Sequence, residues 1–321
     1  MKNYAVISLP NAFGALEAAE KLQQQGYQVE PQLLRQMQKR AIPDDPFFAN
    51  QWHLNNTGQG NGTTGIDANV LGAWDLNVKG KDVTIAIVDD SFETTHEDLF
   101  PNTQAVSTGV HFDFNDFDND PAPDFFSGDA HGVAVGGVAA GRGNNAIGIS
   151  GSAPEAQMVG LRLISGPSTD LDTASALFWQ PVGTPVHVSN NSWGPFDGAG
   201  IGGPGLLSRQ ALEDAALLGR DGLGQVTVFA AGNGLMSNDD ANLDGYANSR
   251  FVLAVAAVDN RGLQSWYSEP GANILVAAPS NGGTRGIFTT DVTGDGGYNP
   301  GAGEPSNRDC SEATRLSMAV R

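Results

Sequence analysis

The stretch Asp82–Leu99, DVTIAIVDDSFETTHEDL, decides the fold of this chain. Its first half, 83–88, is a short apolar run rich in β-branched residues, and it ends at two adjacent carboxylates, Asp89 and Asp90. Such a run predicts a buried parallel strand, and acids at its carboxyl end lie where open α/β sheets place their ligand sites. The same sequence also fits a strand followed by an ordinary solvated loop, because most loops carry no functional site. The two interpretations are distinguished by which other residues of the chain lie near this strand end.

Apolar segments alternate with small-residue segments from residue 45 onward. We predict strands at 83–88, 158–163, 186–189, 226–231, 252–258 and 274–277, and helices at 131–141, 170–179 and 205–219. This alternation predicts an α/β fold with a mostly parallel sheet and helices on both faces.

Residues 1–40 differ in sequence pattern from the rest of the chain, and we predict that they form a separate small α+β segment. Residues 4–32 suggest a strand, a helix capped by Asn11, a C′ residue at Gly26 and a second strand that begins at Tyr27–Val29. Residues 33–44 form a basic stretch that contains the pair Lys39-Arg40 and fits a solvated linker. We therefore expect domains at 1–40 and 41–321.

Composition excludes several classes of function. The chain has 321 residues with 36 acids against 17 bases, a net charge of −19 that argues against nucleic acid as a partner and favours cations or basic substrates. A single cysteine, Cys310, excludes an internal disulfide framework. No apolar run approaches the roughly 18 residues of a membrane span, so we expect no membrane partner. The first residues do not fit a signal peptide, so we expect either a cytoplasmic protein or a missing N-terminus.

Three polar residues stand out in the apolar segments. His131 opens the run HGVAVGGVAAG, Asn233 lies in Gly-Asn-Gly after a strand, and Ser317 lies near the end of the chain. Each has an ordinary explanation: a hydrogen-bonded structural histidine, a tight turn and a surface serine. In sequence order with Asp89, however, they follow the Asp, His, Ser order of subtilisin.

At this point residues 41–321 resemble the subtilisin-like serine proteases (peptidase family S8), and within them the kexin/furin-like branch. The resemblance implies a three-layer α/β/α fold preceded by a propeptide-like segment. The motifs that carry it are Asp45-Pro46-Phe47, Gln51-Trp52-His53-Leu54, Ile87-Val88-Asp89-Asp90, His96-Glu97-Asp98-Leu99, His131-Gly132, Asn144-Asn145-Ala146-Ile147-Gly148, Ser192-Trp193-Gly194-Pro195, Ala231-Gly232-Asn233-Gly234, Asp244-Gly245-Tyr246 and Tyr267-Ser268-Glu269.

The resemblance implies a serine endopeptidase. Ser317 would be the nucleophile, His131 the general base and acid, Asp89 the residue that orients the imidazole, and Asn233 the donor to the oxyanion. Protein or peptide substrates and the chain's own propeptide segment would be its partners. It would be monomeric and secreted or periplasmic, and cleavage after Lys39-Arg40 would be self-processing.

The resemblance also implies specificity for basic residues and a Ca²⁺ cofactor. Ser192, Trp193, Gly194, Asp197, Asp244 and Tyr246 would form the primary pocket, and Asp90 would face the next substrate residue, giving cleavage after Lys-Arg or Arg-Arg. Ser175 replaces an acid of the strictest members, so we expect little demand for a distant basic residue. Calcium would bind Asp45, Asp98 and Asn145 at one site, and Asp197, Asp239 and Glu269 at another. Ordinary solvated loops would also explain Asp197 and Asp244.

The sequence departs from the family around Ser317. Arg315-Leu316 stand where the family has Gly-Thr, one residue is missing between Cys310 and Ser317, and the family's buried helix and β-sandwich domain do not follow Arg321. Ser91 also replaces the glycine that usually follows the acid pair. We therefore expect a C-terminally incomplete catalytic domain, and a catalytically inactive subtilisin fold that at most binds basic peptides is the alternative.

Overall fold

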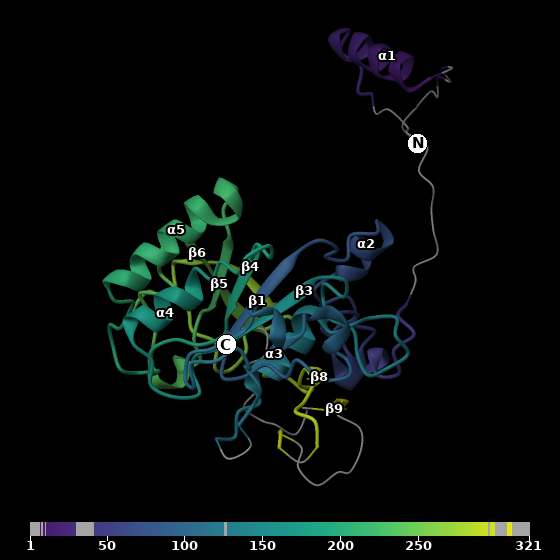
Figure 1. Cartoon of the computed structure of the whole chain (residues 1–321). Coiled ribbons are helices and arrows are strands. Elements are labelled where there is room, and N and C mark those ends of the chain that lie inside the picture. Colours follow the sequence, from purple (N-terminus) through teal and green to yellow (C-terminus); the bar gives the residue numbers. More distant parts are fainter. Residues whose placement is uncertain are drawn as a thin grey trace. The chain divides into compact units, whose positions relative to one another are not determined.

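The computed structural model of the chain describes residues 7, 9, 11–29, 42–124, 127–294 and 296–298, together with the backbone of 307–309. The chain divides into two compact units, Met1–Arg40 and Ala41–Arg321. In Figure 1 the smaller unit contains α1 and the larger one contains every labelled strand.

The smaller unit is built on helix α1, Ala12–Gln24. The Asn11 side chain accepts a hydrogen bond from the Gly14 N–H at 2.8 Å, and Gly26 follows the C-cap residue with a φ of +87°, so both predicted caps are confirmed. Tyr27–Val29 form no strand, and that prediction was wrong because no described segment of this unit pairs with them. Most of the strand predicted before Asn11 lies outside the described residues.

A seven-stranded parallel sheet forms the centre of the larger unit, in the order β2-β3-β1-β4-β5-β6-β7. The strands are β1 Thr84–Asp89, β2 Phe112–Asp113, β3 Gln157–Arg162, β4 Val188–Asn191, β5 Val226–Ala230, β6 Val252–Val258 and β7 Ile274–Pro279. The short β8, Phe288–Thr290, pairs antiparallel with β9, Asn307–Asp309.

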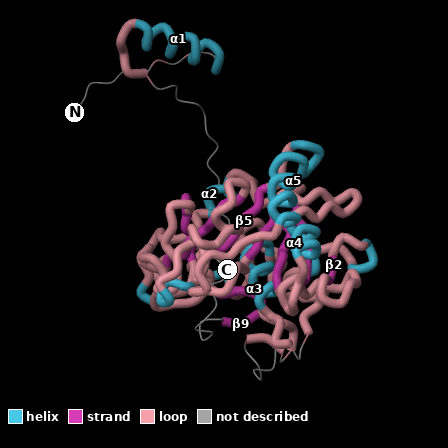
Figure 2. The backbone as a smooth tube through the Cα atoms, turned by 90° about the vertical axis from the view of Figure 1, so that its left-hand side faces the viewer, coloured by secondary structure: helices cyan, strands magenta, loops and turns pink. Residues whose placement is uncertain are grey.

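Helices cover both faces of this sheet (Figures 1 and 2). Ile85 and Ile87 of β1 pack in one apolar cluster with α3, His131–Ala140, whereas Ala86 and Val88 pack in another with α4, Asp170–Leu177. Helix α5, Leu206–Gly222, packs beside α4, and it loses helical geometry at Gly219. The three-layer α/β/α prediction is therefore confirmed.

Short elements complete the unit. Helix α2 spans Val70–Asp75, and 3₁₀ turns lie at Phe48–Asn50, Gln59–Asn61, Phe100–Asn102, Val106–Thr108 and Gly234–Ser237. Asp170, at the start of α4, accepts hydrogen bonds from the backbone N–H groups of Leu207 and Ser208, so one helix supplies the N-terminal cap of the next. Within the described part of the chain, no helix is long and apolar enough to cross a membrane.

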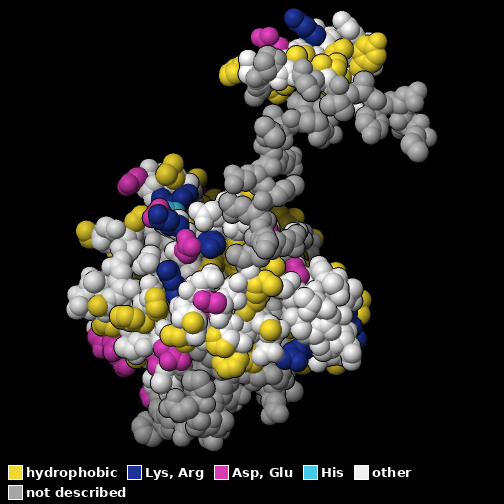
Figure 3. All heavy atoms as spheres, turned by 90° about the vertical axis from the view of Figure 1, so that its right-hand side faces the viewer, with side chains coloured by type: hydrophobic (Ala, Val, Ile, Leu, Met, Phe, Trp, Pro, Cys, Tyr) yellow, Lys and Arg dark blue, Asp and Glu magenta, His cyan; other side chains and the backbone are white. Residues whose placement is uncertain are grey.

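The surface is mixed in character. On the face shown in Figure 3, the described Lys and Arg side chains lie in small separate groups among acidic and hydrophobic ones. That face therefore offers no continuous basic surface for a polyanion.

The buried His53 makes stability depend on pH. Its ring is 3% exposed and neither nitrogen has a described hydrogen-bond partner, so burial lowers the pKa of His53 from 6.5 to about 3. Because the unfolded chain binds this proton below pH 6.5 and the folded chain does not, stability falls as the pH decreases through that window. We expect His53 alone to remove about 2 kcal/mol of the free energy of unfolding between roughly pH 7 and 5.

Urea unfolding at both pH values measures this loss. The matched variant His53→Leu lacks the titrating group, so its pH dependence should be smaller by about 2 kcal/mol. An equal pH dependence in both proteins would show that the ring is hydrated or paired in solution.

Candidate active site

The last residue of β1 and the first residue of α3 form the centre of the site. Asp89 Oδ1 lies 2.8 Å from His131 Nδ1, and the Asp89 side chain is fully buried. Burial raises the pKa of the Asp89 carboxyl, while the adjacent His131 opposes that rise. An anchored carboxylate of this kind fixes the tautomer and orientation of an imidazole.

Helix α3 packs closely against the end of β1. A Cβ atom at Gly132 would overlap the carbonyl oxygen of Ser91 and lie 2.9 Å from Asp89 Cβ. On the other side of the helix, the Thr289 and Thr290 hydroxyls of β8 each donate to an α3 carbonyl at 2.7 Å. The helix that carries His131 is thus fixed on two sides, and only glycine fits at its second residue.

Asp90 contacts the same helix. Its Oδ2 accepts hydrogen bonds from the N–H groups of Ala130 at 3.2 Å and His131 at 3.0 Å. Its Oδ1 accepts from the Gly132 N–H and from the Ser91 hydroxyl, each at 2.9 Å. The half-buried Asp90 lines the neighbouring cleft as well, but its carboxylate is engaged by the protein itself.

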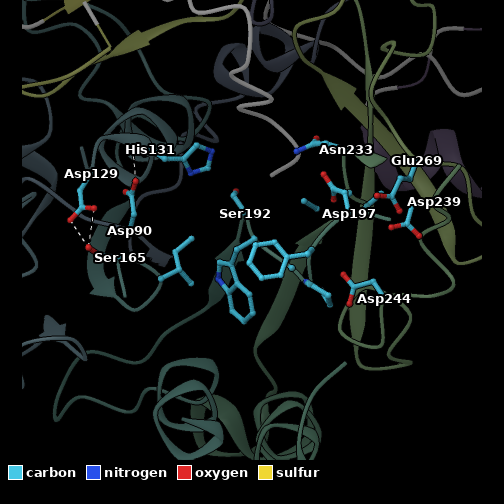
Figure 4. A pocket seen from close by; sticks show the side chains of 18 of the residues that line it. Asp90, Asp129, His131, Ser165, Ser192, Asp197, Asn233, Asp239, Asp244 and Glu269 are labelled. Atoms are coloured by element: carbon cyan, nitrogen blue, oxygen red, sulfur yellow. Dashed lines mark hydrogen bonds between the residues drawn. The ribbon is translucent and has the colours of Figure 1, made fainter. Parts of the chain in front are cut away.

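A cleft of about 1060 Å³ opens beside this pair (Figure 4). His131 and Asn233 face each other from opposite sides of it, with Ser192 between them on the floor. Asn233 follows β5, and its buried Oδ1 has no described partner. The predicted residues that line the cleft are Asp90, His131, Ser192, Trp193, Gly194, Asp197, Asn233, Asp239, Asp244 and Glu269.

One wall of the cleft gathers four carboxylates, Asp197, Asp239, Asp244 and Glu269 (Figure 4). Burial, reinforced by the neighbouring acids, raises the pKa of Asp244 to about 6 and that of Glu269 to about 7. No described residue of the cleft lining is Lys or Arg. Carboxylates in such an environment favour a bound cation, which would relieve their mutual repulsion.

Asp129 and Ser165 line the opposite wall, and they join an ion-pair network behind it that was not predicted from the sequence. Arg162, at the end of β3, contacts Asp113 at 2.7 Å, Asp116 at 3.2 Å and Asp129 at 2.8 Å. The Ser165 hydroxyl also bonds to Asp129. Arg162 offsets only one of these three negative charges, so this side of the cleft is acidic as well.

Other predicted residues lie away from the cleft. Tyr246 is not in the lining: its ring packs behind the wall, 5.2 Å from the ring of Trp193 and 5.4 Å from that of Phe229. Ser175 lies on α4 and bonds to the Leu171 carbonyl. Ser317, Cys310 and Lys39-Arg40 lie outside the described residues.

The structure brings Asp45, Asp98 and Asn145 together elsewhere in the unit. Asp45 accepts from the Asn145 N–H at 3.1 Å, and Asp98 accepts from the Asn145 amide at 2.8 Å. Burial raises the pKa of Asp98 to about 7. Among the described residues, however, no three His, Cys, Asp or Glu side chains are grouped as a metal site. Any ion held here or at Glu269 would need carbonyl or amide oxygens to complete its shell.

Comparison with known proteins identifies the family. The subtilase family profile matches residues 80–319, which include the anchored Asp89–His131 pair. The chain belongs to the subtilase family.

Curated relatives place this subtilase in the kexin-like branch, as predicted. It is 36% identical over 270 residues to a PC3-like endoprotease of Hydra vulgaris, covering 82% of this chain and 37% of the relative. It is 37% identical to mouse proprotein convertase subtilisin/kexin type 4 (82% and 40%) and to human neuroendocrine convertase 2 (85% and 43%). The subtilase chain thus spans less than half the length of these relatives.

Solved structures agree with this assignment. The serine protease of Aeromonas sobria superposes with a TM-score of 0.73 at 27% identity, covering 92% of this chain and 54% of that one. The same protease was also solved with a chaperone, and that complex gives a TM-score of 0.71, 28% identity and coverages of 86% and 50%. The subtilisin-like fold predicted from the motifs is therefore confirmed.

Proposed function

We propose that this subtilase is a calcium-stabilised serine endopeptidase that cleaves after basic residues. The observation that carries the proposal is the buried Asp89–His131 pair, which faces Asn233 across a cleft with four carboxylates on one wall. His131 would take the proton of the Ser317 hydroxyl as it attacks the scissile carbonyl and return it to the leaving amine. Asn233 would donate to the oxyanion that forms.

Hydrolysis of a peptide amide with Lys-Arg before the scissile bond tests the proposal. The peptide is offered to this chain and to a variant with Arg315→Gly and Leu316→Thr, and a peptide with Leu at the cleavage position is the control. Turnover of the basic peptide by either protein supports the proposal, while the absence of turnover by both contradicts it. Turnover by the variant alone would indicate that this chain is a catalytically inactive subtilisin fold. That alternative is based on Arg315-Leu316, which stand where the family has Gly-Thr.

Asp244 would be the main determinant of basic specificity, because its half-buried carboxylate lies on the acidic wall behind Gly194. In a protein that shows turnover, Asp244→Asn is expected to lower kcat/KM for Arg peptides about 10- to 100-fold, since a charge-assisted contact is lost from a desolvated pocket. The kcat/KM for Leu peptides should stay constant or rise. Asp214→Asn, on α5 outside the cleft, is the matched control. An equal loss for Arg and Leu peptides would assign Asp244 a structural role instead.

Calcium would be held by Asp45, Asp98 and Asn145, and by Asp197, Asp239 and Glu269. These sets fit a hard cation because they present oxygen donors on loops and contain buried carboxylates with raised pKa. A bound ion would supply positive charge that removes the repulsion among these acids.

Removing calcium should therefore destabilise the protein. At a calcium concentration roughly 100 times the dissociation constant, binding adds about 3 kcal/mol to the free energy of unfolding. Thermal unfolding in calcium, in chelator and in magnesium measures the difference, and Asp98→Asn should reduce the gain. Equal melting temperatures in calcium and chelator would contradict the proposed cofactor.

Residues 1–40 would act as a propeptide that the enzyme removes after Lys39-Arg40, in a secreted or periplasmic protein. The acidic cleft of the larger unit and the basic pair support self-processing, since the enzyme's proposed specificity matches its own linker. N-terminal sequencing of an active preparation should find Ala41. An active form that still begins at Met1 would exclude this processing step.

A further inference from the structure

A second hollow of about 660 Å³ lies beside the start of α5, between residues 201–213 and 245–251, and we call it the α5 groove. Two arginines, Arg209 and Arg250, line it together with a single acid, Glu213. This balance is the reverse of that of the whole chain, which has 36 acids and 17 bases. On the basis of the proposed endopeptidase function, we propose that the α5 groove binds an acidic segment of the peptide substrate that precedes the cleaved bond.

Both arginines are held in place, and both can still bind a carboxylate. Arg209 donates through Nε to the carbonyl oxygen of Pro204 at 3.0 Å, and the guanidinium carbon of Arg250 lies 5.5 Å from the centroid of the Phe251 ring. Both side chains are exposed, and neither forms an ion pair with another described residue. A guanidinium that is fixed in this way loses little freedom when its N–H fork binds a carboxylate.

The positive charge of the α5 groove comes from side chains. The two arginines contribute +2 and Glu213 contributes −1, so the lining keeps a net charge of +1. The N-terminus of α5 adds little, because the N–H groups of Leu207 and Ser208 already donate to Asp170. The arginines, and not the helix end, would therefore bind the anionic group.

Two large apolar side chains accompany the arginines. Ile201 is 90% exposed and Leu206 is 80% exposed, and both line the α5 groove. Exposed apolar side chains beside arginine are typical of surfaces that bind a polypeptide. The groove therefore favours a segment that contains both acidic and apolar residues over a small inorganic anion.

The α5 groove adjoins the active-site cleft. Gly200 and Asp244 line the cleft, and the residues that follow them, Ile201 and Gly245, line the groove. The Gly245 N–H donates to the Gly202 carbonyl oxygen at 2.7 Å, so one pair of backbone segments separates the two hollows. A single extended peptide can therefore occupy both of them.

The position of His131 indicates which part of the substrate reaches the α5 groove. His131 and Asp244 lie on opposite sides of the cleft (Figure 4). The leaving amine would receive its proton from His131, so the peptide after the cleaved bond lies toward that residue. The peptide before the cleaved bond then extends past Asp244 toward the groove.

Hydrolysis of paired peptides tests the proposal. In each pair a Glu-Leu-Glu or a Gln-Leu-Gln block stands at the same distance before the cleaved Arg, and this distance varies from pair to pair. At the best distance we expect the Glu peptide to have a kcat/KM about tenfold higher, through KM, because two exposed ion pairs contribute about threefold each. A ratio below about twofold at every distance, or an equal gain from a block after the cleaved bond, would overturn the proposal.

Substitution of the two arginines tests the source of the preference. Arg209→Gln and Arg250→Gln should each reduce the ratio about threefold, and the double variant should bring it to about one. The kcat/KM for the Gln peptides should stay unchanged, which verifies that the cleft is intact. Arg220→Gln is the matched control, because Arg220 also lies on α5 and also donates through Nε to a backbone carbonyl, but does not line the groove. A preference that persists in the double variant would contradict the proposal.

Binding without turnover separates this proposal from the endopeptidase function. A fluorescent Glu-Leu-Glu-Leu peptide without basic residues is titrated with the full chain at low salt, and its anisotropy is recorded. The net charge of −19 repels this peptide, so tighter binding than that of Gln-Leu-Gln-Leu requires a local basic site. We expect the Glu peptide to bind about fivefold tighter or more, and the difference to disappear in the double variant.

The outcomes of the binding experiment are distinct. If the Glu and Gln peptides bind alike, the α5 groove proposal is wrong even in an active enzyme. If no peptide is cleaved but the Glu peptide binds tighter and the double variant abolishes the difference, the endopeptidase proposal fails and the acidic-segment site stands.

Discussion

Replacing Asp89 by Asn is expected to lower kcat about 10⁴-fold with little change in KM, the size of effect seen when a triad carboxylate is replaced by an amide. The reason is the 2.8 Å contact between Asp89 Oδ1 and His131 Nδ1 in a fully buried setting. An amide at this position can donate to Nδ1, and it then stabilises the tautomer that cannot accept the serine proton. Steady-state hydrolysis of an Arg peptide measures the loss.

The double variant with His131→Ala is the control for this prediction. Groups that act as one unit lose activity together, so adding His131→Ala to Asp89→Asn should cause far less than a further 10⁴-fold loss. Urea unfolding of each variant verifies that the fold persists. Retention of kcat within about tenfold in Asp89→Asn would show that the pair is structural.

Substituting Gly132 by Ala is expected to reduce both stability and turnover strongly. The added Cβ would overlap the Ser91 carbonyl oxygen, which belongs to the backbone and cannot move aside as a side chain would. We expect a loss of about 3 kcal/mol in the free energy of unfolding, at the upper end for overpacking. The helix would also shift away from β1, which lengthens the Asp89–His131 contact and lowers kcat.

Gly72→Ala is the matched control for this substitution. Gly72 lies in α2 with ordinary helical geometry, and a Cβ there would have only Asn69 Oδ1 nearby, at 3.9 Å. The change should stabilise the protein by up to about 1 kcal/mol through helix propensity. If both variants unfold alike in urea, close packing beneath His131 is not what requires Gly132.

The strands of the sheet were predicted well because they are short, nearly continuous apolar runs, and β1 at the centre is buried along its whole length. Runs such as 252–258 are continuously apolar and bounded by polar turns, so their positions were right within two or three residues. Strand β2 and helix α2 were not predicted. They contain two and six residues, too few for a periodic pattern to be distinguished from a loop.

The parts of the site whose chemistry depends on one residue type could be predicted. Contacts between residues that are far apart in the sequence could not. His131, Asn233 and the acids of one wall were placed in the cleft by their motifs. The network of Arg162 joins groups 33 and 49 residues apart, and no local signal marks such pairs. The three N–H groups that approach Asp90 could not be predicted, because the sequence shows only an acid at that position.

The way α3 is held also determines when the site can come into existence. This helix has three interior glycines and no capping side chain of its own, and each such glycine weakens a helix by about 1 kcal/mol, so it gains stability only by docking. Its hydroxyl partners on β8 lie 155 and 157 residues further along the chain. During synthesis, His131 therefore leaves the ribosome long before Thr289 and Thr290, whose hydroxyls hold its helix in place. We therefore expect the aligned pair to form only after residues 289 and 290 have been made, which would delay the proposed activity until late in synthesis.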